Sequence, residues 1–252
     1  MRKPHFITFT GWDKHTNLEE AAKLSKLYPI EWGVLASEGR QGKEPRYPDL
    51  SIFDVFDKPK WLDSWSKLKF SVHLCGRYAR NVVNEDFDFL DVDSTLSSLL
   101  TSLRLFTRVQ INYRNWTDES LSNVSLFSEL IDVPCIIQWN KEFPIERFHY
   151  GKDDYSDPDY RDTGDLTLES EYLYDLSGGT GQSPSSWPKH PGGKTCVGYA
   201  GGIGPDNVLD VIKELDCQGL YWLDMESKIR TDDILDLSKC RSVCEQVYGV
   251  RS

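Results

Sequence analysis

The sequence lacks any long hydrophobic run. No apolar stretch approaches the roughly 18 residues that a membrane-spanning helix requires. Residues 1–5 and the run that follows them also lack the apolar segment and the small-residue cleavage site of a secretory signal peptide. We therefore expect a cytoplasmic protein with no membrane partner.

Positive charge is also scarce. The chain has 29 Lys and Arg residues against 40 Asp and Glu residues, which gives a formal net charge of −11. Nucleic-acid-binding proteins usually carry a basic stripe, and the sequence shows none. We expect no nucleic-acid partner, and an anionic ligand would need a local positive site inside an acidic field.

Paired cysteines are missing too. The six cysteines are scattered and form no CxxC pair. Cys240 and Cys244 are four residues apart on one expected helix, but no further ligand cluster lies near them in the sequence. We expect reduced thiols, no metal site and no cofactor.

The sequence does contain a repeated alternation of short β-type runs and helical segments. Strands are expected over residues 5–10, 31–37, 70–75, 107–112, 134–139, 172–176, 195–200 and 219–225. Helices are expected over residues 16–28, 60–69, 118–131 and 232–247, the last one capped by Thr231. This pattern predicts an α/β protein, a single-domain (β/α)8 TIM barrel over residues 1–252 with an irregular insert at about 140–170. An open doubly wound sheet is the alternative, which the lack of GxGxxG after the first strand disfavours.

A glycine-rich turn follows the seventh expected strand. Gly201, Gly202 and Gly204 precede Pro205, which suits the first position of a helix running to about Leu215. Free N–H groups and the positive end of the helix dipole would gather at this junction. The turn is therefore a candidate seat for a phosphate or another anion; otherwise it is a strand-to-helix turn that binds nothing.

In a TIM barrel the chemistry lies at the carboxyl ends of the strands. Asp175 ends the sixth expected strand and is the candidate general acid. Asp13, His73 and Cys75 follow or end other strands and are candidates for the base. Each has a structural alternative as well: a loop cap, a hydrogen-bonded core histidine or a buried thiol.

Further polar residues at the same rim are candidate substrate contacts. Arg40 and Arg46 lie on the Gly-rich loop after the second strand and can hold a carboxylate or phosphate through two-pronged contacts. Glu226 and Ser227 follow the last strand and are candidate substrate contacts beside the glycine turn. Asp224 and Glu226 also form a carboxylate pair suited to acid–base work or to a divalent metal.

Several motifs resemble those of one family. The run YLYDLSGGTG at 172–181 and the run GGIGPDNV at 201–208 are similar to the sixth strand and the phosphate-binding motif of phosphoribosylanthranilate isomerases. FTG at 9–11 and PRY at 45–47 resemble, more loosely, the family's opening strand and a basic substrate-contacting turn. The family consists of (β/α)8 barrels of tryptophan biosynthesis, so the resemblance implies the same fold.

The resemblance also implies a chemistry. In the family, an acid at the position of Asp175 protonates the furanose ring oxygen while a base removes the C2 proton, which gives an Amadori rearrangement. The family's base is a cysteine in a Cys-Gly pair, where this chain has Thr10-Gly11. A hydroxyl is a very weak base near neutral pH, and Glu226 stands where the family has small residues beside the phosphate. These departures indicate a diverged branch of the family.

Three functions are compatible with this sequence. The first is an isomerase or lyase that acts on a small phosphorylated or ribosylated metabolite, with Asp175 as the general acid. The second is a non-catalytic barrel that binds an anionic or sugar-containing metabolite and has lost the family's general-base cysteine. The third is a protein-binding adaptor that uses the insert at about 140–170.

Overall fold

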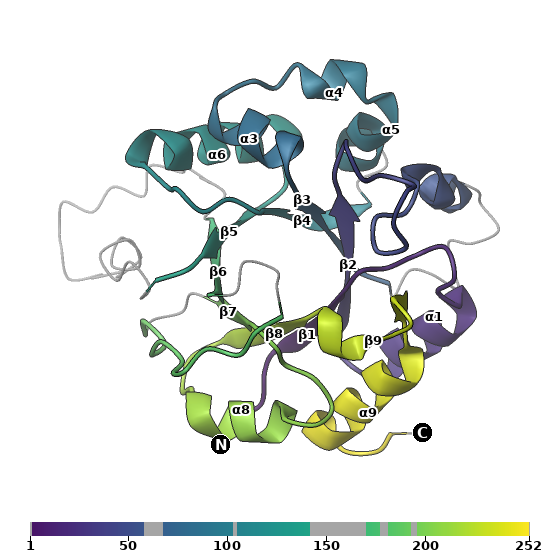
Figure 1. Cartoon of the computed structure of the whole chain (residues 1–252), viewed down its shortest axis with the longest axis vertical. Helices are drawn as coiled ribbons and strands as arrows, with labels where there is room; N and C mark the ends of the chain where they lie inside the picture. Colours follow the sequence, from purple (N-terminus) through teal and green to yellow (C-terminus); the bar gives the residue numbers. More distant parts are fainter. Residues whose placement is uncertain are drawn as a thin grey trace, which may run out of the picture.

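Eight parallel strands form a closed barrel in the computed structural model, which describes residues 2–57, 68–102, 105–141, 170–176, 181–192 and 196–251. Each strand pairs with the next, and β8 pairs with β1 to close the ring (Figure 1). The strands are β1 Phe6–Thr10, β2 Ile30–Ala36, β3 Phe70–Leu74, β4 Phe106–Ile111, β5 Cys135–Trp139, β6 Glu171–Asp175, β7 Val197–Ala200 and β8 Tyr221–Met225. The predicted (β/α)8 barrel is confirmed, and the expected strand ends differ from these by at most two residues.

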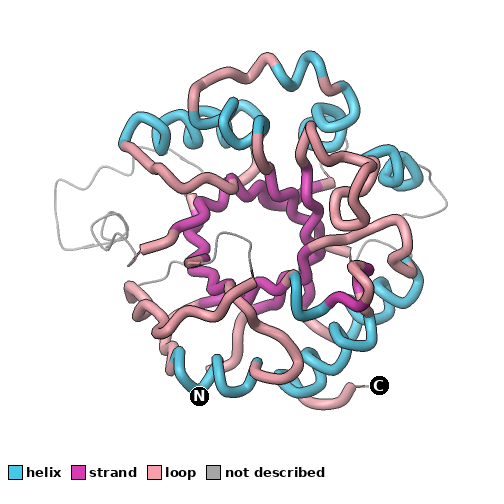
Figure 2. The backbone as a smooth tube through the Cα atoms, viewed as in Figure 1, coloured by secondary structure: helices cyan, strands magenta, loops and turns pink. Residues whose placement is uncertain are grey.

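Helical segments surround the ring of strands, as Figure 2 shows in cyan around magenta. They are α1 Leu18–Leu27, α3 Arg77–Val83, α4 Phe89–Val92, α5 Ser94–Ser97, α6 Asp118–Ile131, α8 Val208–Leu215 and α9 Leu237–Tyr248. Short helical turns lie at η1 Leu50–Asp57, η3 Ser98–Ser102 and η5 Ser227–Ile229. No helix among the described residues has the length and apolar character needed to cross a membrane.

Local signals explain where these helices begin. The Thr117 hydroxyl oxygen accepts a hydrogen bond from the Ser120 N–H, and the Thr117 N–H donates one to the Ser120 hydroxyl, which closes a capping box at the start of α6. The α1 helix begins at Leu18, two residues after the start of the expected range, because Asn17 is the N-cap whose side chain accepts from the Glu20 N–H. The apolar faces of these helices pack on the outward-facing strand residues and form the main core.

The inside of the barrel is polar near the amino ends of the strands. Arg108 of β4 and Glu31 of β2 meet there in an ion pair (2.6 Å), although their strands are not neighbours. Arg108 also pairs with Glu171 and stacks over Trp222, with its guanidinium carbon 4.4 Å from the ring centre. Burial alone would raise the pKa of Glu31, but the charge and hydrogen bonds of Arg108 outweigh it and lower that pKa. A buried network of charged side chains thus fills the barrel near the amino ends of its strands.

The expected start of the helix after the seventh strand is wrong. The chain forms a turn at Pro205, and α8 begins only at Val208. The physical reason is the Asn207 side chain, which accepts from the Gly204 N–H (2.9 Å) and donates to the Gly202 carbonyl (3.0 Å). These bonds fold the glycine turn back on itself, so the helix end lies farther from Gly202 than expected.

The expected start of the last helix is also wrong. The α9 helix begins at Leu237 with Asp236, not Thr231, as its N-cap. The two-stranded hairpin β9 Arg230–Thr231 and β10 Ile234–Leu235 precedes it, with left-handed backbone at Asp232 and Asp233. Local turn chemistry therefore overrides the helical pattern here. The expected helix at 60–69 and the insert at 140–170 lie almost wholly outside the described residues.

Candidate active site

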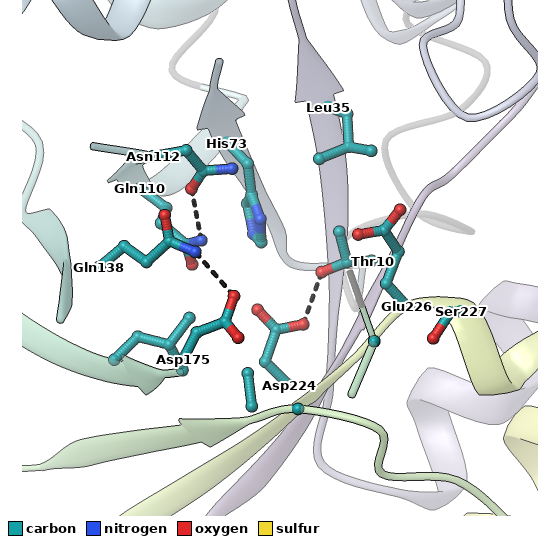
Figure 3. A pocket seen from close by; sticks show the side chains of 14 residues that line it. Thr10, Leu35, His73, Gln110, Asn112, Gln138, Asp175, Asp224, Glu226 and Ser227 are labelled. Atoms are coloured by element: carbon teal, nitrogen blue, oxygen red, sulfur yellow. Dashed lines mark hydrogen bonds between the residues drawn. The ribbon is translucent and has the colours of Figure 1, made fainter. Parts of the chain in front are cut away.

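A cavity opens at the carboxyl ends of the strands, where a TIM barrel carries its chemistry (Figure 3). The lining residues come from all eight strands and the loops after them: Thr10, Leu35, His73, Gln110, Asn112, Gln138, Leu173, Asp175, Gly181, Ala200, Gly201, Asp224, Glu226 and Ser227. The cavity measures about 50 Å³, and an adjoining lobe of about 280 Å³ shares Leu35, Asn112, Gln138 and Glu226 with it. Together they reach the lower end of the size range of small-ligand sites.

Strand register brings Asp175 and Asp224 to the same level of the barrel. Asp175 of β6 pairs with Ala200 of β7, and Ala200 pairs with Asp224 of β8. Two strand spacings of about 4.8 Å separate their backbones, and both side chains point into the cavity with their carboxyl groups toward each other (Figure 3). A small alanine between them leaves room for a ligand to reach both carboxyl groups.

Asp175 is held in place from the neighbouring strand. The Gln138 side chain of β5 donates a hydrogen bond to Asp175 Oδ2 (2.7 Å), and Asp175 is only 6% exposed. Nearby, Gln110 of β4 donates through its amide nitrogen to Asn112 Oδ1 (2.7 Å). The Gln110 carbonyl oxygen is buried and has no hydrogen-bond partner among the described residues. The residues lining the cavity therefore include one oriented carboxyl group and one buried amide oxygen that has no partner among the described residues.

Asp224 is hydrogen-bonded to Thr10, the last residue of β1. Thr10 Oγ1 donates to Asp224 Oδ1 over 2.7 Å (Figure 3). Burial raises the pKa of Asp224 to about 8, against the effect of the Thr10 hydrogen bond. The negative charges of Glu226, Glu31 and Asp175 raise that pKa further. Asp224 is therefore a carboxyl group whose pKa lies near neutral pH, and the sequence suggested it only as one half of a carboxylate pair with Glu226.

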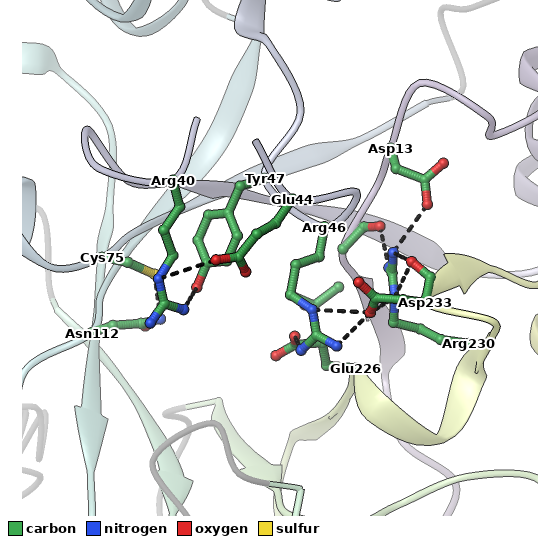
Figure 4. A network of polar contacts seen from close by, with 12 residues as sticks. Asp13, Arg40, Glu44, Arg46, Tyr47, Cys75, Asn112, Glu226, Arg230 and Asp233 are labelled. Atoms are coloured by element: carbon green, nitrogen blue, oxygen red, sulfur yellow. Dashed lines mark hydrogen bonds and ion pairs between the residues drawn. The ribbon is translucent and has the colours of Figure 1, made fainter. Parts of the chain in front are cut away.

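Glu226 and Ser227 both line the cavity, as expected for substrate contacts. Glu226 is not free, because Arg46 donates to its Oε1 over 2.7 Å (Figure 4). Burial raises the pKa of Glu226, and the neighbouring charge of Arg46 opposes that rise. Arg46 also contacts Asp233 Oδ1 (2.5 Å), so two carboxylates already hold the guanidinium that was expected to hold an anion.

Arg40 lies in the adjoining lobe. Its guanidinium carbon lies 5.3 Å from the centre of the Tyr47 ring, and it donates to the Tyr47 hydroxyl (3.2 Å). A longer ion pair joins it to Glu44 (3.7 Å). Arg40, Arg46 and Arg114 all line this lobe (Figure 4 shows the first two). The described lining of the lobe therefore combines three arginines with one carboxylate, Glu226.

The structure places His73 and Cys75 at the same rim, on or just after β3. Burial lowers the pKa of His73 to about 4, so the imidazole is neutral at physiological pH. Burial raises the pKa of Cys75 to about 12, although Asn112 donates a hydrogen bond to its sulfur (3.1 Å). At neutral pH Cys75 is thus a thiol, which is a poor base, and His73 is a neutral lining group.

Asp13 lies away from this cavity, in a network beside it (Figure 4). It is 1% exposed and pairs with Arg230 (3.1 Å), whose side chain also reaches the Gly11 carbonyl. Asp13 further accepts from the Leu235 N–H (2.8 Å). These contacts hold the loop after β1 against the β9–β10 hairpin, so they stabilise the fold.

The chain itself packs against the expected anion seat. Gly201 and Gly202 have φ values of +129° and +61°, which favour glycine. A Cβ atom on Gly202 would lie 2.6 Å from the Ser183 hydroxyl, and one on Gly201 would lie 2.9 Å from the Gln182 carbonyl. Among the described residues, Gly201 borders the cavity and Gly202 does not. An anion can reach the whole turn only if the segment around Ser183 moves aside.

The residues of the cavity offer no obvious metal centre. In the part of the chain that the structure describes, no three His, Cys, Asp or Glu side chains come close enough to hold a metal ion. Asp224 and Glu226, the expected carboxylate pair, are instead committed to Thr10 and Arg46. Their arrangement suits proton transfer.

Comparison with known proteins agrees with this architecture. The sequence profile of the N-(5'-phosphoribosyl)anthranilate (PRA) isomerase family matches residues 114–246, more than half of the chain. The chain belongs to this family. A search of curated proteins found no match.

Solved structures show the same fold. The N-(5'-phosphoribosyl)anthranilate isomerase of Pyrococcus furiosus superposes with a TM-score of 0.51 at 12% identity, covering 97% of this chain and 99% of that one. The phosphoribosyl anthranilate isomerase of Thermotoga maritima gives 0.50 at 15% identity, covering 97% and 100%. At these identities the likeness shows the barrel fold alone.

Proposed function

We propose that this barrel is an isomerase that acts on a small phosphorylated or ribosylated metabolite, with Asp175 as its general acid. The observation that carries the proposal is the placement of Asp175: it ends β6, faces the cavity and is aimed by Gln138. A buried, oriented carboxyl group is suited to proton transfer to a bound ligand. Membership of the PRA isomerase family supports the reaction class.

The proposed first step is ring opening. Asp175 gives its proton to the ring oxygen of a ribosyl amine while the adjacent C–O bond breaks, and a base then takes a proton from the neighbouring carbon. The buried Gln110 oxygen supports a sugar as the ligand, because it lacks a partner among the described residues and a sugar hydroxyl could donate to it. Leaving such an acceptor unpaired costs about 1–3 kcal/mol, so a hydroxyl-bearing ligand gains from binding there.

The anionic group of the ligand has two candidate positions. The Gly201–Gly202 turn supplies backbone N–H groups at the edge of the cavity, once the segment around Ser183 moves away. The adjoining lobe supplies Arg40 and Arg114. We propose the glycine turn for a phosphate, because it is the motif that matches the family.

A metabolite-binding barrel without turnover is the second candidate function. It is favoured by Thr10, which replaces the family's cysteine and is engaged as a donor to Asp224. Such a protein would bind a sugar phosphate in the same cavity and return it unchanged.

The test compares conversion with binding. Purified protein is incubated with N-(5'-phosphoribosyl)anthranilate, and the isomerised product is quantified by chromatography. We expect turnover that falls at least about 100-fold in Asp175→Asn, while Asp210→Asn, an exposed change on α8, keeps the wild-type rate. Calorimetric binding of ribose 5-phosphate without any conversion would instead support the second candidate.

A further inference from the structure

One hydrogen bond links the end of β1 to a carboxyl group on the next strand around the barrel. Thr10 stands where the family has its basic cysteine, and its hydroxyl donates to Asp224 of β8. Gly33 makes room for this contact, because a Cβ atom on Gly33 would lie 2.4 Å from Thr10 Oγ1. Where the family has a basic cysteine, this chain therefore has a threonine whose hydrogen-bond partner, Asp224, can accept a proton.

We propose that Asp224 is the base of this active site, that Thr10 positions it, and that the pair replaces the cysteine of the family. The inference rests on the proposed function, because it assigns the second proton transfer of the same reaction. It is carried by the geometry: Asp224 lines the cavity at the level of Asp175, from the opposite side of Ala200.

The surroundings of Asp224 make it a stronger base than an ordinary aspartate. Its pKa of about 8 means that its carboxylate binds a proton far more tightly than one that titrates near 4. In the described part of the chain, four titratable groups face Asp224: Glu226, Glu31, Asp175 and the neutral His73. Arg46 pairs with Glu226, and Arg108 pairs with Glu31. Both glutamates are paired with an arginine, whereas Asp175 and Asp224 accept hydrogen bonds from Gln138 and Thr10 and line the cavity.

The proton transfers balance without any further reactant. Asp175 gives a proton to the ring oxygen as the C–O bond breaks, which leaves an iminium ion. Asp224 takes the proton from the adjacent carbon, and the electron pair of that C–H bond forms the enolamine. Asp224 then returns the proton to the carbon that bears the nitrogen, and the enol hydroxyl returns one to Asp175. The product is a ketoamine, and both carboxyl groups are restored.

Asp224→Asn is the first test. The amide keeps the shape and can still accept from Thr10, but it cannot take a proton. We expect conversion of N-(5'-phosphoribosyl)anthranilate to fall at least about 100-fold, with a melting temperature close to that of the wild type. As a second readout, the wild type should exchange deuterium from solvent into C1 of ribulose 5-phosphate, and Asp224→Asn should not.

Restoring the family's residue is the sharper test. In the double variant Thr10→Cys with Asp224→Asn, the thiol faces the cavity from β1, so turnover should recover at least about tenfold over Asp224→Asn and increase with pH as the thiol ionises. A double variant no faster than Asp224→Asn at any pH would refute the idea that the two positions share one task.

The positioning role of Thr10 has its own readout. Thr10→Val removes a hydrogen bond that favours the ionised form of Asp224, so the rising limb of the pH–rate profile should move to higher pH. Thr10→Ser should restore the wild-type profile. If Asp224→Asn does not fold, this pair of variants decides the matter, and an unshifted profile in Thr10→Val contradicts the proposal.

These outcomes distinguish a failure of the Asp224 assignment from a failure of the proposed function. An Asp224→Asn protein that converts and exchanges as fast as the wild type overturns the assignment of Asp224 and leaves the proposed function standing. A wild type that neither converts the anthranilate ribotide nor exchanges ribulose 5-phosphate overturns both.

Discussion

Replacement of Arg108 by leucine is the most direct probe of how the barrel is filled. Arg108 and Glu31 are only 9% and 5% exposed in their side chains, and the guanidinium also contacts Glu171 and stacks over Phe6 and Trp222. Among the described residues, Arg108→Leu leaves only Thr8 as a hydrogen-bond donor to the buried Glu31 carboxylate. The perturbation is thus an uncompensated charge inside the barrel.

The expected loss follows from that burial. Removing one partner of a buried ion pair costs about 3–5 kcal/mol, since the remaining charge stays desolvated. At about 2–4 °C per kcal/mol for a chain of this size, the melting temperature should fall by about 6–20 °C. Arg77→Leu is the matched control, because the Arg77–Glu38 pair is exposed (63% and 48%) and should cost less than about 1 kcal/mol.

The same variant predicts a pH dependence. In the wild type, Arg108 lowers the folded-state pKa of Glu31, so the pair stabilises the fold above the unfolded pKa and this contribution is lost as pH falls through the folded value. In Arg108→Leu, burial without a partner raises the pKa of Glu31, so acidification relieves the penalty. The stability gap between the two proteins should therefore shrink from pH 7 toward pH 4.

The assay is urea unfolding followed by tryptophan fluorescence at several pH values, with Arg108→Leu/Glu31→Leu as the companion variant. Removing both charges should recover much of the loss, because hydrophobic groups of similar size often replace a buried pair without cost. A single variant that loses less than about 1 kcal/mol, or a double variant no more stable than the single one, would refute this reasoning.

Three further predictions concern the rim of the barrel. Gly202→Ala should destabilise the fold by about 1–3 kcal/mol, since φ is +61° and a Cβ atom meets the Ser183 hydroxyl; urea unfolding at the wild-type midpoint would contradict this. Cys75 should react with iodoacetamide at pH 7.5 about a thousandfold more slowly than a free cysteine, because its pKa is about 12; peptide mass spectrometry measures this, and fast labelling in the folded protein would be the opposing result. Asp13→Asn should lower stability by about 1–3 kcal/mol, because the buried Arg230 then keeps, within the described ranges, only the partly exposed Asp233 as an ion-pair partner, while ribose 5-phosphate binding stays at the wild-type level; lost binding at unchanged stability would place Asp13 in the site instead.

Much of the barrel was predictable because its signals are local. The α6 helix matches its expected range, since a capping box and an apolar periodicity agree there. The cavity residues Asp175, His73 and Glu226 were also within reach, because any polar residue that ends a barrel strand faces the same rim.

The errors and omissions have a different origin. Asp13 lies in the loop after the first strand, but its partner Arg230 is 217 positions away, and no local signal tells a buried ion pair from a catalytic carboxylate. Pro205 fits a helix start, yet the Asn207 side chain bonds back to Gly202 and Gly204, so the chain turns there and the helix begins only at Val208. Asp224 gained its significance only from the Thr10 hydrogen bond and the depth of its burial. The sequence predicts which residues lie at the same end of the barrel, but their contacts in the folded structure determine which of them can transfer a proton.

A crystal structure of the protein with ribose 5-phosphate tests the central claim most directly. The account predicts the sugar between Asp175 and Asp224, a sugar hydroxyl donating to the Gln110 carbonyl oxygen, and the phosphate on the N–H groups of the Gly201–Gly202 turn with the segment around Ser183 displaced. A sugar phosphate bound wholly in the Arg40 lobe, with no ligand atom within hydrogen-bond reach of Asp175 or Asp224, would contradict it.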